Sequence, residues 1–173
     1  MRGAFLDRDG VINKVKLHRN IPLPPSKIDE IEILEGVLEA ITLLTERKFL
    51  PVVVTNQPDI ARGLISREHV DSINQRISQL TGIKHFYVCP HDDNQFCTCR
   101  KPKPGLIKQA VLDLNLTLDG SIVVGDRWRD IEAGQSLKMS SYFIDYSYDE
   151  KRPEQPYLKV SSLLEAAQKV SGI

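Results

Sequence analysis

The stretch Gly3-Ala4-Phe5-Leu6-Asp7-Arg8-Asp9-Gly10 joins a short apolar run directly to two carboxylates. The run Gly3–Leu6 has the length and the continuous apolar character of a strand that is buried on both faces. In an open parallel sheet, ligands bind beyond the carboxyl ends of the strands, near the point where the strand order reverses. We therefore expect Asp7 and Asp9 to lie at a ligand site at the edge of such a sheet.

Alternation of strands and helices predicts the fold. Further apolar or β-branched runs are predicted as strands: Leu50–Thr55, Lys84–Cys89, Ser121–Gly125 and Ser141–Asp145. Apolar stripes at helical spacing predict four helices, and a shorter helix is expected over about 129–137. The stripes are Val37, Ile41 and Leu44; Val70, Ile73, Ile77 and Leu80; Leu106, Ala110, Val111 and Leu114; and Leu163, Leu164, Ala167 and Val170. This pattern predicts an α/β fold, a Rossmann-like three-layer sandwich around a central, mainly parallel five-stranded sheet.

Bulk properties limit the classes of function. The 173 residues are predicted to form a single domain, 1–173, without a large cap, and Pro22, Pro24 and Pro25 stiffen the segment after the first strand. Lys and Arg together number 23, as do Asp and Glu, so the net charge of zero argues against a protein that coats nucleic acid or an anionic membrane. Asp7 interrupts the N-terminal apolar run, which speaks against a signal peptide, and no run is long enough to span a bilayer. We expect a cytoplasmic monomer.

A second acidic group, Gly125-Asp126-Arg127-Trp128-Arg129-Asp130, follows the apolar run 122–124. If the two strands are neighbours, Asp7, Asp9, Asp126 and Asp130 converge. Clustered carboxylates repel one another unless a cation is present, and oxygen-only ligands favour Mg²⁺. Acidic residues at strand ends also cap helices and turns, so the prediction depends on the two groups occurring together. The sequence leaves open whether Asp130 is a metal ligand.

Two further segments carry groups that suit phosphate oxygens. Thr55-Asn56-Gln57 ends a predicted strand with a hydroxyl and two amides. Arg100-Lys101-Pro102 places two cations before a helix. Each segment alone is typical of an ordinary turn or a solvated surface.

Together, these four elements resemble the haloacid dehalogenase superfamily of phosphohydrolases. The resemblance implies a Mg²⁺-dependent phosphatase in which Asp7 is the nucleophile and Asp9 the general acid and base. Thr55 would hold the transferring phosphoryl group and Lys101 would neutralise its charge. Asp126 would complete the Mg²⁺ site with Asp7 and the backbone carbonyl of Asp9.

The cysteines form a separate cluster. Cys89, His91, Cys97 and Cys99 provide three thiolates and one imidazole within one predicted loop, 89–99. This is a complete tetrahedral set for a structural Zn²⁺, with no position left for water. Idle thiols are the alternative, and a disulfide would leave one cysteine unpaired. Because Arg100 and Lys101 follow directly, zinc would stiffen the loop that orients them.

Within the superfamily, the cysteine segment resembles the small capless branch with heptose bisphosphate and histidinol-phosphate phosphatases. The segments 56–63, 101–105 and 125–128 look more like the heptose enzymes. The resemblance implies D-glycero-D-manno-heptose 1,7-bisphosphate as substrate, losing its C7 phosphate. Substrate-binding residues would be Asn56, Gln57, Arg62, Arg100 and Arg127. The short loop between His91 and Cys97 and the segment 15–18 depart from the heptose pattern.

Other readings remain open. A histidinol phosphatase, or a phosphatase of another small molecule or of polynucleotides, would share the same chemistry. A zinc-stabilised binding module or a receiver-like signalling domain would not be an enzyme. The neutral charge and few aromatic residues of this sequence leave little surface for nucleic acid, and receiver domains lack the Asp-x-Asp pair that it carries. His18, His69, His85 and Trp128 are interpreted as surface or packing residues.

Overall fold

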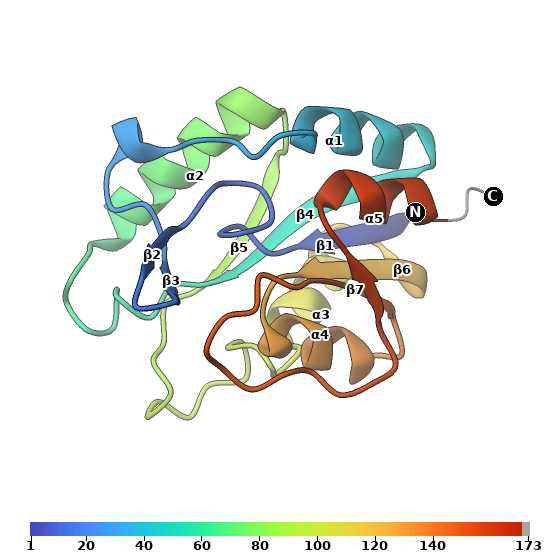
Figure 1. Cartoon of the computed structure of the whole chain (residues 1–173). Helices are drawn as coiled ribbons and strands as arrows, with labels where there is room; N and C mark the ends of the chain where they lie inside the picture. Colours follow the sequence, from blue (N-terminus) through green and yellow to red (C-terminus); the bar gives the residue numbers. More distant parts are fainter. Residues whose placement is uncertain (171–173) are drawn as a thin grey trace.

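The centre of the computed structural model, which describes residues 1–170, is a parallel sheet in the order β5-β4-β1-β6-β7-β8 (Figure 1). The strands are β1 (Arg2–Leu6), β4 (Phe49–Asn56), β5 (His85–Cys89), β6 (Thr117–Gly125), β7 (Ser140–Ile144) and β8 (Leu158–Val160). The chain adds β4 and β5 on one side of β1 and then β6, β7 and β8 on the other. The strand order therefore reverses between β1 and β6, which is where ligands bind in such sheets.

Helices cover both faces of the sheet (Figure 1). On one face, α1 (Val37–Glu46), α2 (Arg67–Thr81) and α5 (Leu163–Lys169) bury their apolar stripes against alternate strand residues such as Leu6 and Val124. On the other face, α3 (Gly105–Asp113) and α4 (Trp128–Gln135) pack against Phe5 and Val123. The expected three-layer α/β sandwich is confirmed.

Local sequence signals set several helix ends. Ser66 caps α2, because its side chain accepts a hydrogen bond from the His69 amide. Gly82 ends the same helix in the left-handed region, with φ 79°. The Ser162 side chain caps α5 in the same way as Ser66 caps α2.

The sheet contains six strands, so the prediction of five strands was wrong by one. The missed strand, β8, has only three residues and a single buried side chain, Val160, which is too little pattern to predict from sequence. It lies at the edge of the sheet and pairs in parallel with β7.

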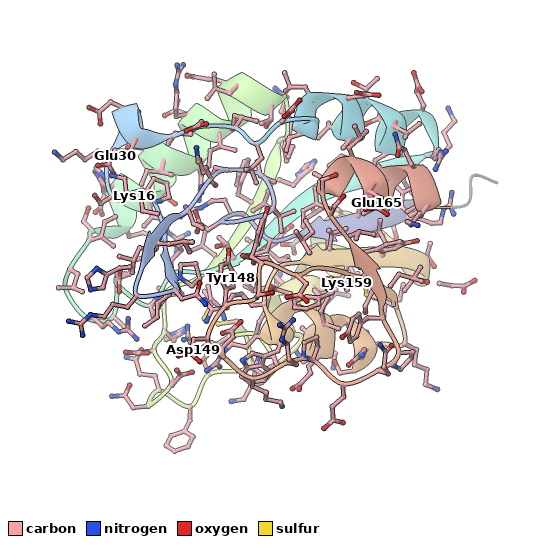
Figure 2. The ribbon with its side chains drawn as sticks, in the orientation of Figure 1. Lys16, Glu30, Tyr148, Asp149, Lys159 and Glu165 are labelled. Carbon is pink, nitrogen blue, oxygen red and sulfur yellow. The ribbon has the colours of Figure 1, made fainter. Side chains whose placement is uncertain are left out.

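The segment after the first strand also holds more structure than expected. The strands β2 (Lys16–His18) and β3 (Ile21–Leu23) form an antiparallel hairpin. Arg19 and Asn20 join them with φ 50° and 60°, as a two-residue type I′ turn requires. A short 3₁₀ helix, η1 (Ile28–Glu30), follows, and its Glu30 Oε1 lies 2.6 Å from Lys16 Nζ on β2 (Figure 2).

Only the hairpin and η1 lie between β1 and α1, and only α2 lies between β4 and β5. No cap domain is therefore inserted at either position. Within residues 1–170, no helix combines the length and the apolar character that crossing a membrane requires.

Candidate active site

A cavity of about 360 Å³ opens where β1, β4 and β6 end. It brings together all the residues that the sequence associated with catalysis, magnesium binding and substrate binding. They are Asp7, Asp9, Thr55, Asn56, Gln57, Arg62, Arg100, Lys101, Asp126 and Arg127. Asp130 lines the same cavity, and the hairpin contributes Ile21, Pro22 and Leu23 to its wall.

The pairing of β1 with β6 brings the two acidic groups together. Leu6 lies opposite Val124, and the Asp7 amide donates to the Val124 carbonyl at 3.0 Å. Asp126 follows two residues later, so one carboxylate oxygen each from Asp7, Asp126 and Asp130 lie within 4.8 Å of one another. The expectation that the two strands are neighbours is confirmed.

Lys101 reaches the floor of the cavity as a buried cation, 3 % exposed. Its Nζ lies 2.7 Å from Asp7 Oδ1 and 2.5 Å from Asp130 Oδ1, and it donates to the Val54 carbonyl at 2.6 Å. Burial alone would lower the pKa of Lys101, but the carboxylates of Asp130 and Asp7 raise it above the ordinary value. Lys101 is therefore a fixed positive charge beside Asp7.

Asn56 holds the backbone that carries this lysine. Its amide side chain donates to the Lys101 carbonyl and accepts from the Lys101 amide, both at 3.1 Å. Asn56 thus links the end of β4 to the loop before α3. Both the nitrogen and the oxygen of the Asn56 amide are engaged in these two hydrogen bonds.

The carboxylate of Asp126 is buried and, among the described residues, neither of its oxygens has a hydrogen-bond partner. Burial, followed by the charges of Asp7 and Asp130, raises the pKa of Asp126 well above its ordinary value. Burial likewise raises the pKa of Asp7 to about 7, although Lys101 acts in the opposite direction. Unpaired buried oxygens of this kind fit a hard divalent cation such as Mg²⁺.

Gly10 leaves room for that carboxylate. It has φ 89°, and a Cβ there would meet Asp126 Oδ2 at 2.0 Å. The hydroxyl of Tyr146 donates to the Gly10 carbonyl at 3.1 Å. Tyr148, also in the segment after β7 (Figure 2), is buried nearby, and burial together with the Asp126 charge raises the pKa of its hydroxyl.

Asp130 uses both of its oxygens within the protein. One pairs with Lys101, and the other accepts from the Arg127 amide at 3.0 Å at the start of α4. This geometry favours an orienting contact for Lys101 over direct metal binding.

Asp9 also lines the cavity, and its carboxylate is held by three side chains. Its carboxylate accepts from Gln57 Nε2 at 2.8 Å, from Asn13 Nδ2 at 2.9 Å and from Arg8 Nη2 at 2.8 Å. The same Gln57 nitrogen lies 2.9 Å from Thr55 Oγ1. Gln57 therefore connects the hydroxyl at the end of β4 to the carboxylate after β1.

The arginines at the cavity mouth are paired with acidic residues. Arg62 contacts Asp92 at 2.6 Å, and Arg127 binds Glu150. Asp93 contacts Arg100 at 2.8 Å and Arg129 at 3.0 Å. The sequence did not point to Asp93 or Arg129, although two adjacent acids between metal-ligand candidates were a possible signal.

The cysteine cluster brings its four donor atoms within 4.8 Å of one another. The Cys89 sulfur lies 3.2 Å from the Cys99 sulfur and 3.9 Å from the Cys97 sulfur, and His91 Nδ1 lies 3.3 Å from the Cys99 sulfur. Thiolates about 2.3 Å from one tetrahedral Zn²⁺ would be about 3.8 Å apart, whereas a disulfide needs about 2.05 Å. The group fits Zn²⁺. Burial raises the pKa of the Cys89 thiol, so only a bound cation would favour its thiolate.

The residues interpreted as surface or packing have local roles. His69 Nε2 lies 2.8 Å from the Ser26 carbonyl. The centre of the Trp128 ring lies 4.7 Å from the Arg129 guanidinium carbon and 4.3 Å from Lys151 Nζ, and Trp128 is not among the residues that line the cavity.

Comparison with known proteins adds independent evidence. A curated relative from Pasteurella multocida, named D-glycero-beta-D-manno-heptose-1,7-bisphosphate 7-phosphatase, is 36% identical over 154 residues, which cover 81% of this chain and 79% of the relative. A relative of the same name from Bordetella bronchiseptica is 34% identical over 83% of this chain and 80% of its own length.

The solved structure of D,D-heptose 1,7-bisphosphate phosphatase from B. bronchiseptica, complexed with magnesium and phosphate, matches with a TM-score of 0.82 and 26% identity. The match covers 98% of this chain and 97% of that chain. The family model of haloacid dehalogenase-like hydrolases matches residues 1–138. The sequence resemblance is thereby confirmed, and the chain belongs to the haloacid dehalogenase-like hydrolase family.

Proposed function

We propose that this chain is a phosphatase that hydrolyses a phosphate monoester through an aspartyl-phosphate on Asp7. The observation that carries the proposal is the geometry around Asp7. This carboxylate lies at the cavity floor, 2.7 Å from the buried Lys101 cation and beside the unpaired carboxylate of Asp126. A carboxylate nucleophile with fixed positive charge around it is the arrangement that phosphoryl transfer requires.

In the first half of the reaction, an Asp7 oxygen attacks the phosphorus atom and the bond from phosphorus to the ester oxygen breaks. Asp9 gives its proton to the departing oxygen. Lys101 offsets the charge on the phosphoryl oxygens, and the Thr55 hydroxyl, held by Gln57, donates to one of them. In the second half, Asp9 takes a proton from water, the water oxygen attacks the phosphorus, and Asp7 is released together with inorganic phosphate.

Mg²⁺ would be held by Asp7, Asp126 and the backbone carbonyl of Asp9. When bound, it supplies further positive charge against the phosphoryl oxygens. Zn²⁺ would be held by the Cys89, His91, Cys97 and Cys99 group and would have a structural role, because these four groups complete a tetrahedron.

For the substrate we propose a heptose bisphosphate, D-glycero-D-manno-heptose 1,7-bisphosphate, that loses its C7 phosphate. The names of the relatives support this choice. The mouth of the cavity carries Arg62, Arg100 and Arg127, which suit a substrate with a second anionic group. The proposal includes one domain over residues 1–173 and action as a monomer in the cytoplasm.

The test is phosphate release from heptose 1,7-bisphosphate, from histidinol phosphate and from a simple sugar monophosphate, with and without Mg²⁺. We expect release to depend on Mg²⁺, to be fastest with the heptose bisphosphate, and to fall at least about 10³-fold in Asp7→Asn. Asp71→Asn is the matched control, because it makes the same chemical change at an exposed position of α2 that does not line the cavity. Turnover that survives Asp7→Asn would exclude this residue as the nucleophile.

A further inference from the structure

Arg8 is a buried charge for which the proposed reaction gives no role. It lies between the two catalytic aspartates in sequence, yet it is 1 % exposed and is not among the residues that line the cavity. A guanidinium stays protonated at any ordinary pH, so burying it is unfavourable unless polar partners surround it. The partners of Arg8 therefore indicate what it does.

Those partners lie at opposite ends of the guanidinium. Nη2 donates to Asp9 Oδ2 at 2.8 Å, and Nε lies 3.2 Å from both oxygens of the same carboxylate. Nη1 donates to the side-chain oxygen of Asn74 at 2.9 Å. Asn74 belongs to α2 and is itself 5 % exposed. Arg8 is thus a bridge from the buried Asn74 on α2 to the Asp9 carboxylate that lines the cavity.

The bridge determines the direction of the Asp9 side chain. Asn13 and Gln57 also donate to this carboxylate, but each offers a single neutral N–H. Arg8 contributes charge and two nitrogens in a rigid plane, a stronger and more directional contact. Since proton transfer requires the carboxyl group within hydrogen-bond reach of the leaving oxygen, its direction affects the rate.

We propose that Arg8 is a positioning residue for the acid–base step, anchored by Asn74. The inference rests on the proposed function, in which Asp9 protonates the leaving oxygen. Arg8 transfers no proton: the proton moves from Asp9 to the ester oxygen as the bond to phosphorus breaks. Because Asn74 belongs to α2, this helix helps to position the acid–base group through Arg8.

The proposal predicts a dependence on the leaving group. An alkoxide must be protonated as it departs, whereas p-nitrophenolate departs without an acid. A displaced Asp9 should therefore slow attack on an alkyl phosphate and leave attack on p-nitrophenyl phosphate nearly unchanged. The ratio kcat/KM reports this first half-reaction, because it covers only the steps up to departure of the leaving group.

The test uses the full chain with Mg²⁺ and compares kcat/KM for glycerol phosphate and p-nitrophenyl phosphate. Asn74→Leu removes the anchor while leaving Arg8 and Asp9 in place, and Asn74→Asp keeps an acceptor oxygen for Nη1. We expect Asn74→Leu to lower kcat/KM for glycerol phosphate on the order of 10-fold to 100-fold and that for p-nitrophenyl phosphate by less than about twofold. Asn74→Asp should retain the wild-type ratio of the two constants.

Thermal melting checks that each variant is folded at the assay temperature. If Asn74→Leu melts too early, Asn74→Ala removes the same acceptor with less steric change, and the same pattern is expected of it. An equal loss on both esters, or a loss on neither, overturns the positioning role. A wild-type protein inactive on both esters and on the sugar phosphates would instead refute the proposed function.

Discussion

At the scale of single residues, Asp130 contacts the buried Lys101 cation and holds its position in the cavity. It joins Lys101 to the first turn of α4, since one oxygen pairs with Nζ and the other accepts from the Arg127 amide. With Asp7 and the Val54 carbonyl, it completes the set of acceptors around the lysine. The position of this cation is therefore held from three elements.

Replacing Asp130 by Asn tests this role. The variant keeps the size of the side chain but loses the charge that pairs with Lys101, so the lysine is expected to shift towards Asp7. We expect kcat to fall on the order of 10-fold, and the free energy of unfolding to fall by about 1–3 kcal/mol, because a hydrogen bond to a buried charged group is lost. Steady-state kinetics and urea unfolding measure the two effects. Unchanged values for both would contradict the orienting role.

At the scale of elements, the cysteine loop connects the end of β5 to Lys101. The Arg100 amide lies 3.4 Å from the Cys97 sulfur, and the Gly105 amide at the start of α3 donates to the Thr98 carbonyl at 3.1 Å. A metal that ties Cys97 and Cys99 to Cys89 would therefore hold the backbone that leads into Lys101.

Cys97→Ser is predicted to lose the metal and, with it, part of the activity. Elemental analysis should find about one zinc per chain in the wild type and a strongly reduced content in the variant, because a hydroxyl is a poor zinc ligand. The melting temperature and kcat should both fall. Phe96→Ser on the same loop is the control: Phe96 is fully exposed, so zinc content and kcat should not change. Wild-type protein without zinc would remove the structural role of this metal.

At the scale of the whole molecule, the sheet buries carboxylates at its carboxyl edge at the expense of stability. The pKa of Asp7 is raised to about 7 and that of Asp126 is raised well above its ordinary value, in both cases mainly by burial. A carboxyl group with a raised pKa binds more protons in the folded than in the unfolded chain between the two pKa values. The free energy of unfolding therefore falls as the pH rises through that interval.

Without added Mg²⁺, the free energy of unfolding should fall from pH 5 to pH 7. Added Mg²⁺ should raise it more at pH 7 than at pH 5, because the ionised carboxylates bind the ion. Ion-paired carboxyls with lowered pKa values, such as Glu30 and Asp145 at about 2, lose their stabilisation below this pH interval and do not mask the effect. Urea unfolding at three pH values, with and without Mg²⁺, measures this pH dependence of the free energy of unfolding.

Asp126→Asn is the matched variant, since it removes one of the buried charges while keeping the shape of the side chain. Its stability should vary less with pH and should respond less to Mg²⁺. If the free energy of unfolding changed with pH by the same slope in the wild type and in the variant, the link between these carboxylates and stability would be contradicted.

Much of the fold was accessible from the sequence because burial leaves a local pattern. Continuous apolar runs mark the buried strands, as at Gly3–Leu6, and apolar stripes mark the helices. Short elements escaped prediction for the same reason. The three residues of β8 and of each hairpin strand bury too few side chains to form a pattern.

The sequence by itself determined the chemistry available to the site: two acidic groups after two strands, a lysine before a helix, and a cluster of thiols with a histidine. Only the tertiary structure decided how these groups pair. Arg8 meets Asn74 across 66 positions of sequence, and Lys101 divides its contacts between Asp7 and Asp130. Such pairings depend on strand order and side-chain direction, which follow from packing of distant segments and leave no trace in local residue patterns.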